Sequence, residues 1–239
     1  MLRRVALLID SCVDKVLIAF SIVAVLICCY AMFDAAMVYY NANDTGVLKY
    51  KPELGAGAET LRELSEDAIA WLTVDGTKID YPVMQGENNA EYVNKNPYGK
   101  FALSGSIFLD SRNSPDFTDP YSLLYGHHME YGMMFGALDD YLNEDFLDTH
   151  RTGRLVTVSG SSYDIVLFAS LYVQANEKVV FDPPESSNTA LLEYLKEHAQ
   201  VYAPVEGHEN DSILALSTCT TAESLDRTVV FGMLTTSAW

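Results

Sequence analysis

The sequence predicts a mainly β protein, a barrel or a sandwich, that follows one apolar helix at the N-terminus. Three observations carry this prediction. An uncharged run occupies residues 16–33, a long remainder follows it, and short apolar runs separated by Gly, Asn, Asp and Pro recur through that remainder. A remainder of roughly 200 residues is enough for one domain with a sizeable core.

The uncharged run at 16–33 predicts a transmembrane anchor. Its length is about the minimum of ~18 residues for a helix that crosses the hydrocarbon core, and a buried core helix is the alternative. Arg3, Arg4 and Lys15 precede the run and Asp34 follows it, which by the positive-inside bias leaves the N-terminus cytoplasmic and the rest outside. No small-residue cleavage site follows at the right distance, so an uncleaved anchor is favoured over a signal peptide. We therefore expect a cytoplasmic N-terminus at 1–15, an anchor at 16–33, a juxtamembrane segment and linker at 34–57, and a folded extracellular domain at 58–239.

The formal charge of −18 lies outside the anchor region. Residues 1–41 contain three basic and three acidic side chains, which cancel, so the whole net charge belongs to residues 42–239. Binding to phosphate needs the opposite sign of charge, which argues against a nucleic-acid partner. A solvated acidic surface is the expected consequence.

A helix is predicted first in the remainder, after the Gly- and Ala-rich connector at 55–58, because apolar residues recur there at helical spacing. They are Leu61, Leu64, Ala68, Ile69 and Leu72. The strand pattern follows, with apolar runs bounded by turn residues, as in a barrel or sandwich. The runs are 79–84, 106–109, 122–125, 155–158, 165–173, 213–216 and 229–234.

One further helix interrupts these strands. Ser187 or Asn188 is the N-cap candidate, and an apolar stripe follows that ends before Pro204. The stripe consists of Leu191, Leu192, Leu195 and Ala199. This pattern predicts a helix inserted between two strands.

Cys219 is the one cysteine in the polar body, because Cys12, Cys28 and Cys29 lie in or beside the apolar segment. Without an intramolecular partner there, it is either an inert buried thiol or a reactive one. A nucleophilic thiol needs a neighbouring imidazole or cation that holds the thiolate.

His127 and His128 are the candidates for that imidazole, because they follow Gly126 at the end of the strand at 122–125. Adjacent residues on an extended chain point to opposite sides, so one of the two can face the thiol. A metal site is the alternative, but further Cys or His residues at ligand spacing do not accompany the pair. The other histidines, which are His150, His198 and His208, are expected on the solvated surface.

Arg227 is the candidate cation. It precedes the β-prone run at 228–234 and should begin a strand near the one that ends at Cys219. A guanidinium there could stabilise an oxyanion or hold a substrate carbonyl. The alternative is a structural ion pair with Asp226 or Glu223.

Three segments of the sequence resemble the His, Cys and Arg motifs of sortases, and most closely those of class B. The segments are Tyr125-Gly126-His127-His128-Met129 with Met134-Phe135-Gly136, Leu216-Ser217-Thr218-Cys219-Thr220, and Arg227 with Val229-Val230-Phe231-Gly232. Trp71-Leu72, Ile79-Asp80-Tyr81-Pro82-Val83 and Gly105-Ser106-Ile107-Phe108-Leu109-Asp110 are also similar to that class. The resemblance spans residues 58–235. It implies a closed β-barrel of about eight strands with N-terminal helices and an inserted helix.

The resemblance also implies roles for individual residues. Cys219 would be the nucleophile, His127 the general acid and base, and Arg227 the stabiliser of the oxyanion or the substrate. The family usually has Asn where this chain has His128, which leaves open an exchange of roles between the two histidines. The residues that align with positions lining the peptide groove are Asn89, Tyr125, Ser217 and Thr220.

The implied reaction is transpeptidation at a C-terminal sorting signal of a secreted protein, with a thioester intermediate that an amine resolves. The amine would come from a peptidoglycan precursor or from a pilin, and both fit the sequence. The chemistry requires no cofactor and no metal. Two alternatives belong to other classes: a hydrolytic cysteine peptidase, and a catalytically silent, membrane-tethered binding domain.

Overall fold

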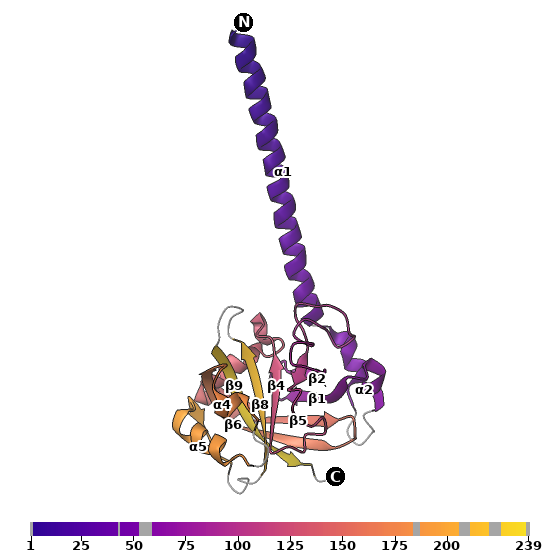
Figure 1. The fold of residues 1–239 in the computed structure, drawn as a ribbon, viewed down its shortest axis with the longest axis vertical. Helices are drawn as coiled ribbons and strands as arrows, with labels where there is room; N and C mark the ends of the chain where they lie inside the picture. Colours follow the sequence, from indigo (N-terminus) through magenta and orange to yellow (C-terminus); the bar gives the residue numbers. More distant parts are fainter. Residues whose placement is uncertain are drawn as a thin grey trace. The chain divides into compact units, whose positions relative to one another are not determined.

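The structure, a computed structural model, describes residues 2–42, 44–52, 59–183, 187–205, 211–219 and 226–237, with the side chains of 2–11, 41, 59 and 219 left aside. The chain divides into two compact units, Met1–Asn41 and Ala42–Trp239. The first unit is a single helix and the second contains the whole sheet (Figure 1). Each unit is described by itself.

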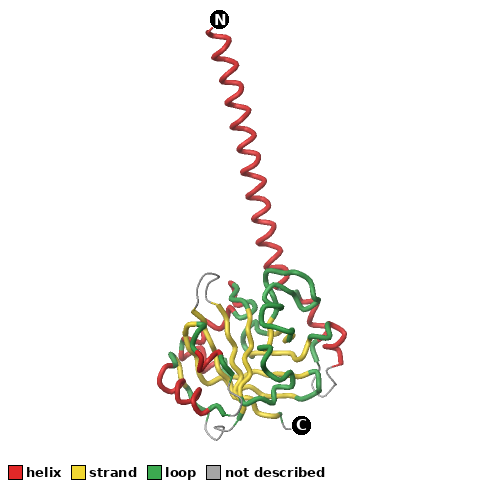
Figure 2. Tube along the Cα trace, in the orientation of Figure 1, coloured by secondary structure: helices red, strands yellow, loops and turns green. Residues whose placement is uncertain are grey.

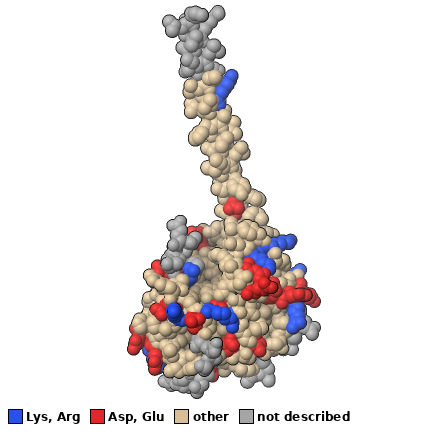
Figure 3. All heavy atoms as spheres, viewed as in Figure 1, with Lys and Arg blue, Asp and Glu red and all other residues tan. Residues whose placement is uncertain are grey.

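The first unit is formed by α1 (Leu2–Ala42). Its apolar side chains between Val13 and Phe33 are exposed, and the helix is long and apolar enough to cross a membrane. The predicted span at 16–33 lies within it, and Figure 3 shows that this helix has a long stretch without Lys, Arg, Asp or Glu. The helix continues beyond both ends of the predicted span.

The second unit is a closed β-barrel of eight strands with one additional short strand. The ring runs β5-β1-β2-β3-β4-β8-β9-β6, and β6 pairs back with β5, which closes it. The ring strands are β1 (Ala68–Val74), β2 (Asp80–Met84), β3 (Ile107–Leu109), β4 (Tyr121–Gly126), β5 (Thr152–Thr157), β6 (Ser162–Gln174), β8 (Ser212–Cys219) and β9 (Asp226–Thr236). The extra strand β7 (Val201–Tyr202) pairs with β6. The predicted barrel is therefore confirmed, and each of the seven predicted apolar runs overlaps a strand.

Helical segments lie at the periphery of the strands (Figure 2). They are η1 (Thr45–Tyr50), α2 (Glu59–Leu64), η2 (Glu130–Gly132), η3 (Gly136–Leu142), α3 (Glu144–Thr149), α4 (Lys178–Phe181) and α5 (Thr189–His198). The inserted helix is α5, which begins after Asn188, one of the two predicted N-caps. It lies between β6 and β7, as the pattern predicted.

The prediction of one helix from Leu61 through Leu72 is wrong. Helix α2 ends at Leu64, and Ala68, Ile69 and Leu72 belong to strand β1. This strand is paired on both sides, by β2 and β5, and most of its residues are buried. An apolar run that is buried on both faces contains residues at helical spacing by chance, so periodicity alone does not distinguish it from a helix.

One core cluster fixes the three neighbouring strands β4, β8 and β9 against α5. Leu123, Ala215 and Phe231 contribute one buried side chain from each strand, and Leu191 and Leu195 from α5 pack with them. Fully burying an apolar side chain of this size contributes about 1.5–3 kcal/mol. This packing holds the three strands in a fixed arrangement.

Candidate active site

The backbone brings the ends of β4, β8 and β9 together. Gly126 pairs with Thr218 across the parallel strands β4 and β8, and Cys219 pairs with Arg227 across the antiparallel strands β8 and β9. His127 follows Gly126 directly. The three residues proposed for catalysis therefore lie at one end of three adjacent strands, with Cys219 on the central strand. The expected position of Arg227, at the start of a strand beside Cys219, is confirmed.

A pocket of about 250 Å³ opens at this end of the strands. It is lined by Asn89, Val93, Phe108, Tyr125, Gly126, His127, Ser217, Thr218 and Arg227. The structure thus brings together five of the seven residues proposed for the site from the sequence, namely Asn89, Tyr125, His127, Ser217 and Arg227. Thr220 lies outside the described residues, and of Cys219 the structure describes the backbone but not the side chain.

The imidazole of His127 is held by the main chain. Its Nε2 atom lies 2.7 Å from the carbonyl oxygen of Val93. Because a carbonyl oxygen only accepts hydrogen bonds, Nε2 carries the hydrogen in this arrangement. In the neutral ring, Nδ1 is then the nitrogen that can accept a proton.

His128 makes a different contact from its neighbour. Its Nε2 atom lies 3.1 Å from Oδ2 of Asp139 on η3, and His128 is not among the residues that line the pocket. This divergence is the one expected for adjacent residues on an extended chain. The structure therefore gives the position in the pocket to His127.

Gly126 allows the close packing that places His127. A Cβ atom at this position would collide with the side chains of Ile107 and Phe135. The end of β4 can thus pack tightly against β3 and against the start of η3. A larger residue at 126 would require a shift of these side chains or of the strand end that precedes His127.

Two pocket side chains are held by the buried carboxylate of Asp110. Asn89 Nδ2 donates to Oδ2 of Asp110 at 2.9 Å, and the hydroxyl of Tyr125 donates to the same oxygen at 3.0 Å. Arg112 donates to both oxygens through Nε and Nη2, each at 2.9 Å. Burial acts to raise the pKa of Asp110, but the hydrogen bonds from Arg112 and Asn89 outweigh it and lower the pKa. Asn89 and Tyr125 are therefore held in the pocket by hydrogen bonds to an ionised Asp110 carboxylate.

We expect Asp110→Asn to lower the free energy of unfolding by about 3 kcal/mol at neutral pH, because it removes the buried carboxylate to which Arg112, Asn89 and Tyr125 donate. Since the folded pKa of Asp110 is lowered, its stabilising contribution is complete above the unfolded pKa of about 4 and is lost as the pH falls below it. Urea unfolding of both proteins at pH 7 and near pH 3 measures this, and the difference should narrow at the lower pH.

Asp182→Asn is the matched control for this prediction. Asp182 also contacts Arg112, at 2.8 Å, but its side chain is 68% exposed. An exposed ion pair contributes about 0–1 kcal/mol, so this variant should remain close to the wild type. An equal loss of stability in Asp110→Asn at both pH values would contradict the lowered pKa.

Ser217 is buried at the wall of the pocket, and its hydroxyl has no hydrogen-bond partner within the described part of the chain. Leaving a buried polar group unpaired costs about 1–3 kcal/mol. A bound peptide could satisfy this hydroxyl, which fits the role that the resemblance implies for Ser217.

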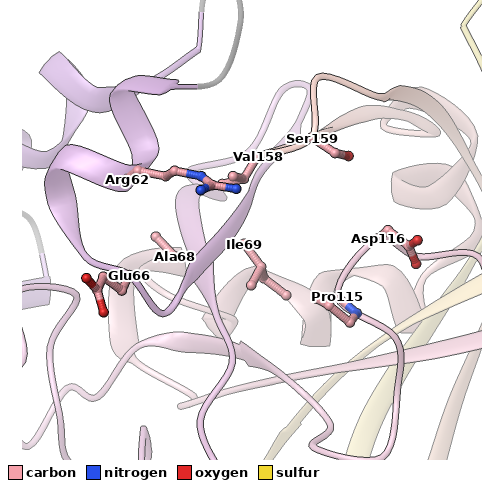
Figure 4. A pocket seen from close by; sticks show the side chains of 8 residues that line it. All are labelled: Arg62, Glu66, Ala68, Ile69, Pro115, Asp116, Val158 and Ser159. Atoms are coloured by element: carbon pink, nitrogen blue, oxygen red, sulfur yellow. The ribbon is translucent and has the colours of Figure 1, made fainter.

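A larger hollow, of about 520 Å³, contains none of the candidate residues. Figure 4 shows its lining, which comes from α2, the start of β1, the loop before β4 and the turn between β5 and β6. The residues are Arg62, Glu66, Ala68, Ile69, Pro115, Asp116, Val158 and Ser159. Its size alone does not make it the reaction site, because it lacks an imidazole and a thiol.

The similarity of this chain to known proteins covers the segment that contains the His, Cys and Arg motifs. The family described as "Sortase domain" matches residues 72–235. The chain belongs to the sortase family. This sortase is 34% identical over 209 residues to Sortase B of Listeria monocytogenes, with 85% of this chain and 83% of that protein covered. It is 28% identical over 178 residues to Sortase B of Staphylococcus aureus, with 74% and 72% covered.

Solved class B structures share the fold. A Streptococcus pyogenes class B sortase involved in pilus biogenesis is 36% identical, with a TM-score of 0.68 and coverage of 77% of this chain and 100% of that one. A Staphylococcus aureus sortase B–substrate complex is 28% identical, with a TM-score of 0.69 and coverage of 75% and 85%. The sortase described here is accordingly a cysteine transpeptidase with the class B barrel.

Several residues at the site were not assigned a role from the sequence. Val93 and Phe108 line the pocket, and Asp110 with Arg112 supports two of its side chains. The one available signal was Asp110 directly after an apolar strand, with Arg112 two residues later. This pattern indicates a local ion pair, but the contact with Asn89 depends on the fold.

Proposed function

We propose that the protein is a membrane-anchored sortase in which Cys219, His127 and Arg227 perform transpeptidation on a C-terminal sorting signal. The supporting observation is the convergence of β4, β8 and β9, which puts His127 and Arg227 in one pocket beside the backbone of Cys219. α1 would be the single-pass anchor, with residues 1–15 in the cytoplasm and the catalytic domain at 58–239 outside the cell. Sortases act on sorting signals and amine acceptors, and both are presented at a cell surface.

In the first step, His127 accepts the proton of the Cys219 thiol and the thiolate attacks the backbone carbonyl carbon at a Thr of the sorting signal. Arg227 stabilises the oxyanion of the tetrahedral intermediate by charge-assisted hydrogen bonds. His127 then donates its proton to the leaving amine, the C–N bond breaks, and a thioester remains on Cys219.

In the second step, an amine attacks the thioester carbonyl and gives up a proton to His127. The C–S bond breaks, the sulfur recovers the proton, and a new amide bond links the sorted protein to the acceptor. One acid–base residue serves both steps, in opposite directions. The bond between His127 and the carbonyl of Val93 keeps the ring orientation constant through the two steps.

The peptide groove in this proposal is formed by Asn89, Tyr125, Ser217 and Thr220. Asn89 and Tyr125 are positioned by Asp110, and Ser217 offers a buried hydroxyl that lacks a partner within the described chain. Polar groups of this kind recognise the amide groups of an extended peptide.

Product analysis tests the proposed function. The full-length protein in detergent is incubated with a panel of sorting-signal peptides, alone, with a cell-wall stem peptide, and with a pilin that provides a Lys amine. Ligation to one of the two amines supports the transpeptidase and identifies the acceptor. Cleavage without ligation in every reaction would instead establish a hydrolytic cysteine peptidase, and the absence of any thioester would favour a silent binding domain.

We expect Arg227→Lys to lose roughly a hundredfold or more in kcat/KM, although the charge is retained. An ammonium cannot reproduce the planar pair of donors of a guanidinium, and removal of one oxyanion donor costs about 2.7–4 kcal/mol in the barrier. Steady-state kinetics and the melting temperature are measured together.

Arg154→Lys is the control, because Arg154 forms a partly exposed ion pair with Asp164. Its kinetics should remain those of the wild type. If Arg227→Lys and Arg227→Ala also kept wild-type kcat/KM, Arg227 would be a structural residue.

A further inference from the structure

Asp139 connects the two strand ends that carry His127 and Arg227. Its Oδ2 atom lies 3.1 Å from Nε2 of His128, and its Oδ1 atom accepts a hydrogen bond of 2.6 Å from the hydroxyl of Thr228. His128 is the residue after His127, and Thr228 is the residue after Arg227. One carboxylate therefore bridges the direct neighbours of two proposed catalytic residues. We call His128, Asp139 and Thr228 the Asp139 bridge.

The segment that presents Asp139 is held tightly. The amide of Phe135 donates to the carbonyl oxygen of His127 at 3.1 Å, and His128 forms an isolated β-bridge with Met134. The amide of Met134 donates to the hydroxyl of Tyr81 on β2 at 3.0 Å. The chain after β4 thus folds back on itself before η3 begins, which fixes the position of Asp139 relative to His127.

The burial of the three residues indicates what the bridge does. Thr228 is fully buried, whereas the side chains of His128 and Asp139 are 29% and 39% exposed. An ion pair with this exposure contributes little to stability. The contact between His128 and Asp139 persists in both charge states of the imidazole, because Nε2–H donates in the neutral ring as well. The main effect of the contact between His128 and Asp139 is therefore to fix the relative positions of the segments that carry these two residues.

We infer that the Asp139 bridge is a positioning device that sets the separation of His127 and Arg227 across the Cys219 strand. The inference rests on the proposed roles of these three residues. A displacement of about 1 Å in a reacting group can reduce the rate roughly a hundredfold. Asp139, His128 and Thr228 touch no reacting atom in this scheme and act through their neighbours.

Thr228→Val tests the bridge with little change in shape, since it replaces the hydroxyl by a methyl group. We expect it to lower kcat roughly tenfold to a hundredfold while KM for the peptide changes less than threefold. Thr228→Ser retains the hydroxyl and should restore most of the lost kcat. Asp139→Ala should match Thr228→Val, and the double variant should lose no more than either single variant, because the residues act as one unit.

The experiment uses the full-length protein in detergent and the peptide of the sorting-signal panel that the wild type cleaves fastest. Asp140→Ala is the matched control, because Asp140 is the next residue on η3 and is exposed; it should keep the wild-type kcat. Melting temperatures are measured for all variants, and rates are taken well below them.

Each outcome decides the question. Wild-type kcat in Thr228→Val and Asp139→Ala, with or without a lower melting temperature, would overturn the bridge and leave the proposed function intact. Additive losses in the double variant would also overturn it. A wild-type protein that forms no thioester with any peptide of the panel would overturn the proposed function, and the bridge with it.

Discussion

Cys219→Ala should form no thioester with any sorting peptide, while its melting temperature stays close to that of the wild type. The reaction has no other nucleophile in this scheme, so the loss of turnover should be complete. The resemblance to sortases implies that the Cys219 thiol lies at a groove, where its removal leaves no packed void, whereas truncation of a core side chain typically costs several kcal/mol. Mass spectrometry of the protein after incubation with peptide measures the acyl-enzyme, and thermal unfolding measures the fold.

The control replaces Cys12, Cys28 and Cys29 together by Ser, since these cysteines are exposed on α1. This variant should form the thioester at the wild-type rate in detergent. Wild-type turnover in Cys219→Ala would end the sortase mechanism proposed for this chain.

His127→Ala should lower kcat by roughly a hundredfold to ten-thousandfold, the usual contribution of a positioned acid–base group. The loss should affect both the formation of the thioester and its resolution by an amine, because one imidazole serves both. Single-turnover measurement of each step, with peptide alone and then with added amine, tests this expectation.

His128→Asn is the matched variant for the histidine pair. The amide of Asn can still donate to Asp139, and Asn is the residue type that sortases usually carry at this position, so most of the activity should remain. An inactive His128→Asn beside an active His127→Ala would exchange the roles of the two residues and leave the mechanism otherwise unchanged.

The strands of the barrel could be predicted from the sequence because turn residues separate them. The run at 122–125 and the run at 229–234, for example, lie in β4 and β9. The order of the strands could not be predicted in the same way. The parallel pairing of β4 with β8 joins segments that are far apart in the chain, and local propensity carries no information about such a pairing. Strand β7 was missed because two residues are too few to show a period.

The residues of the site also fall into two groups: those that could be predicted from local sequence and those that depend on contacts between distant segments. Residues with distinctive chemistry in short motifs, such as His127 and Arg227, could be proposed from the sequence and from its resemblance to sortases. Asp110 and Asp139 could not, because an acidic residue in a chain rich in carboxylates is ordinarily solvated. Their importance depends on contacts with Asn89 and Thr228 that exist only in the folded barrel.

The closure of the barrel constrains how this enzyme can vary. Each strand of the ring is paired on both sides, so its offset is fixed by two neighbours. A one-residue deletion within β8 would shift Cys219 relative to Arg227 and turn the following side chains to the opposite face. The excursion between β6 and β8, which contains α4, α5 and β7, lies outside the ring. Leu191 and Leu195 of α5 pack against β4, β8 and β9, so a change of length in this excursion leaves the alignment of Cys219 with Arg227 unchanged only where it keeps that packing.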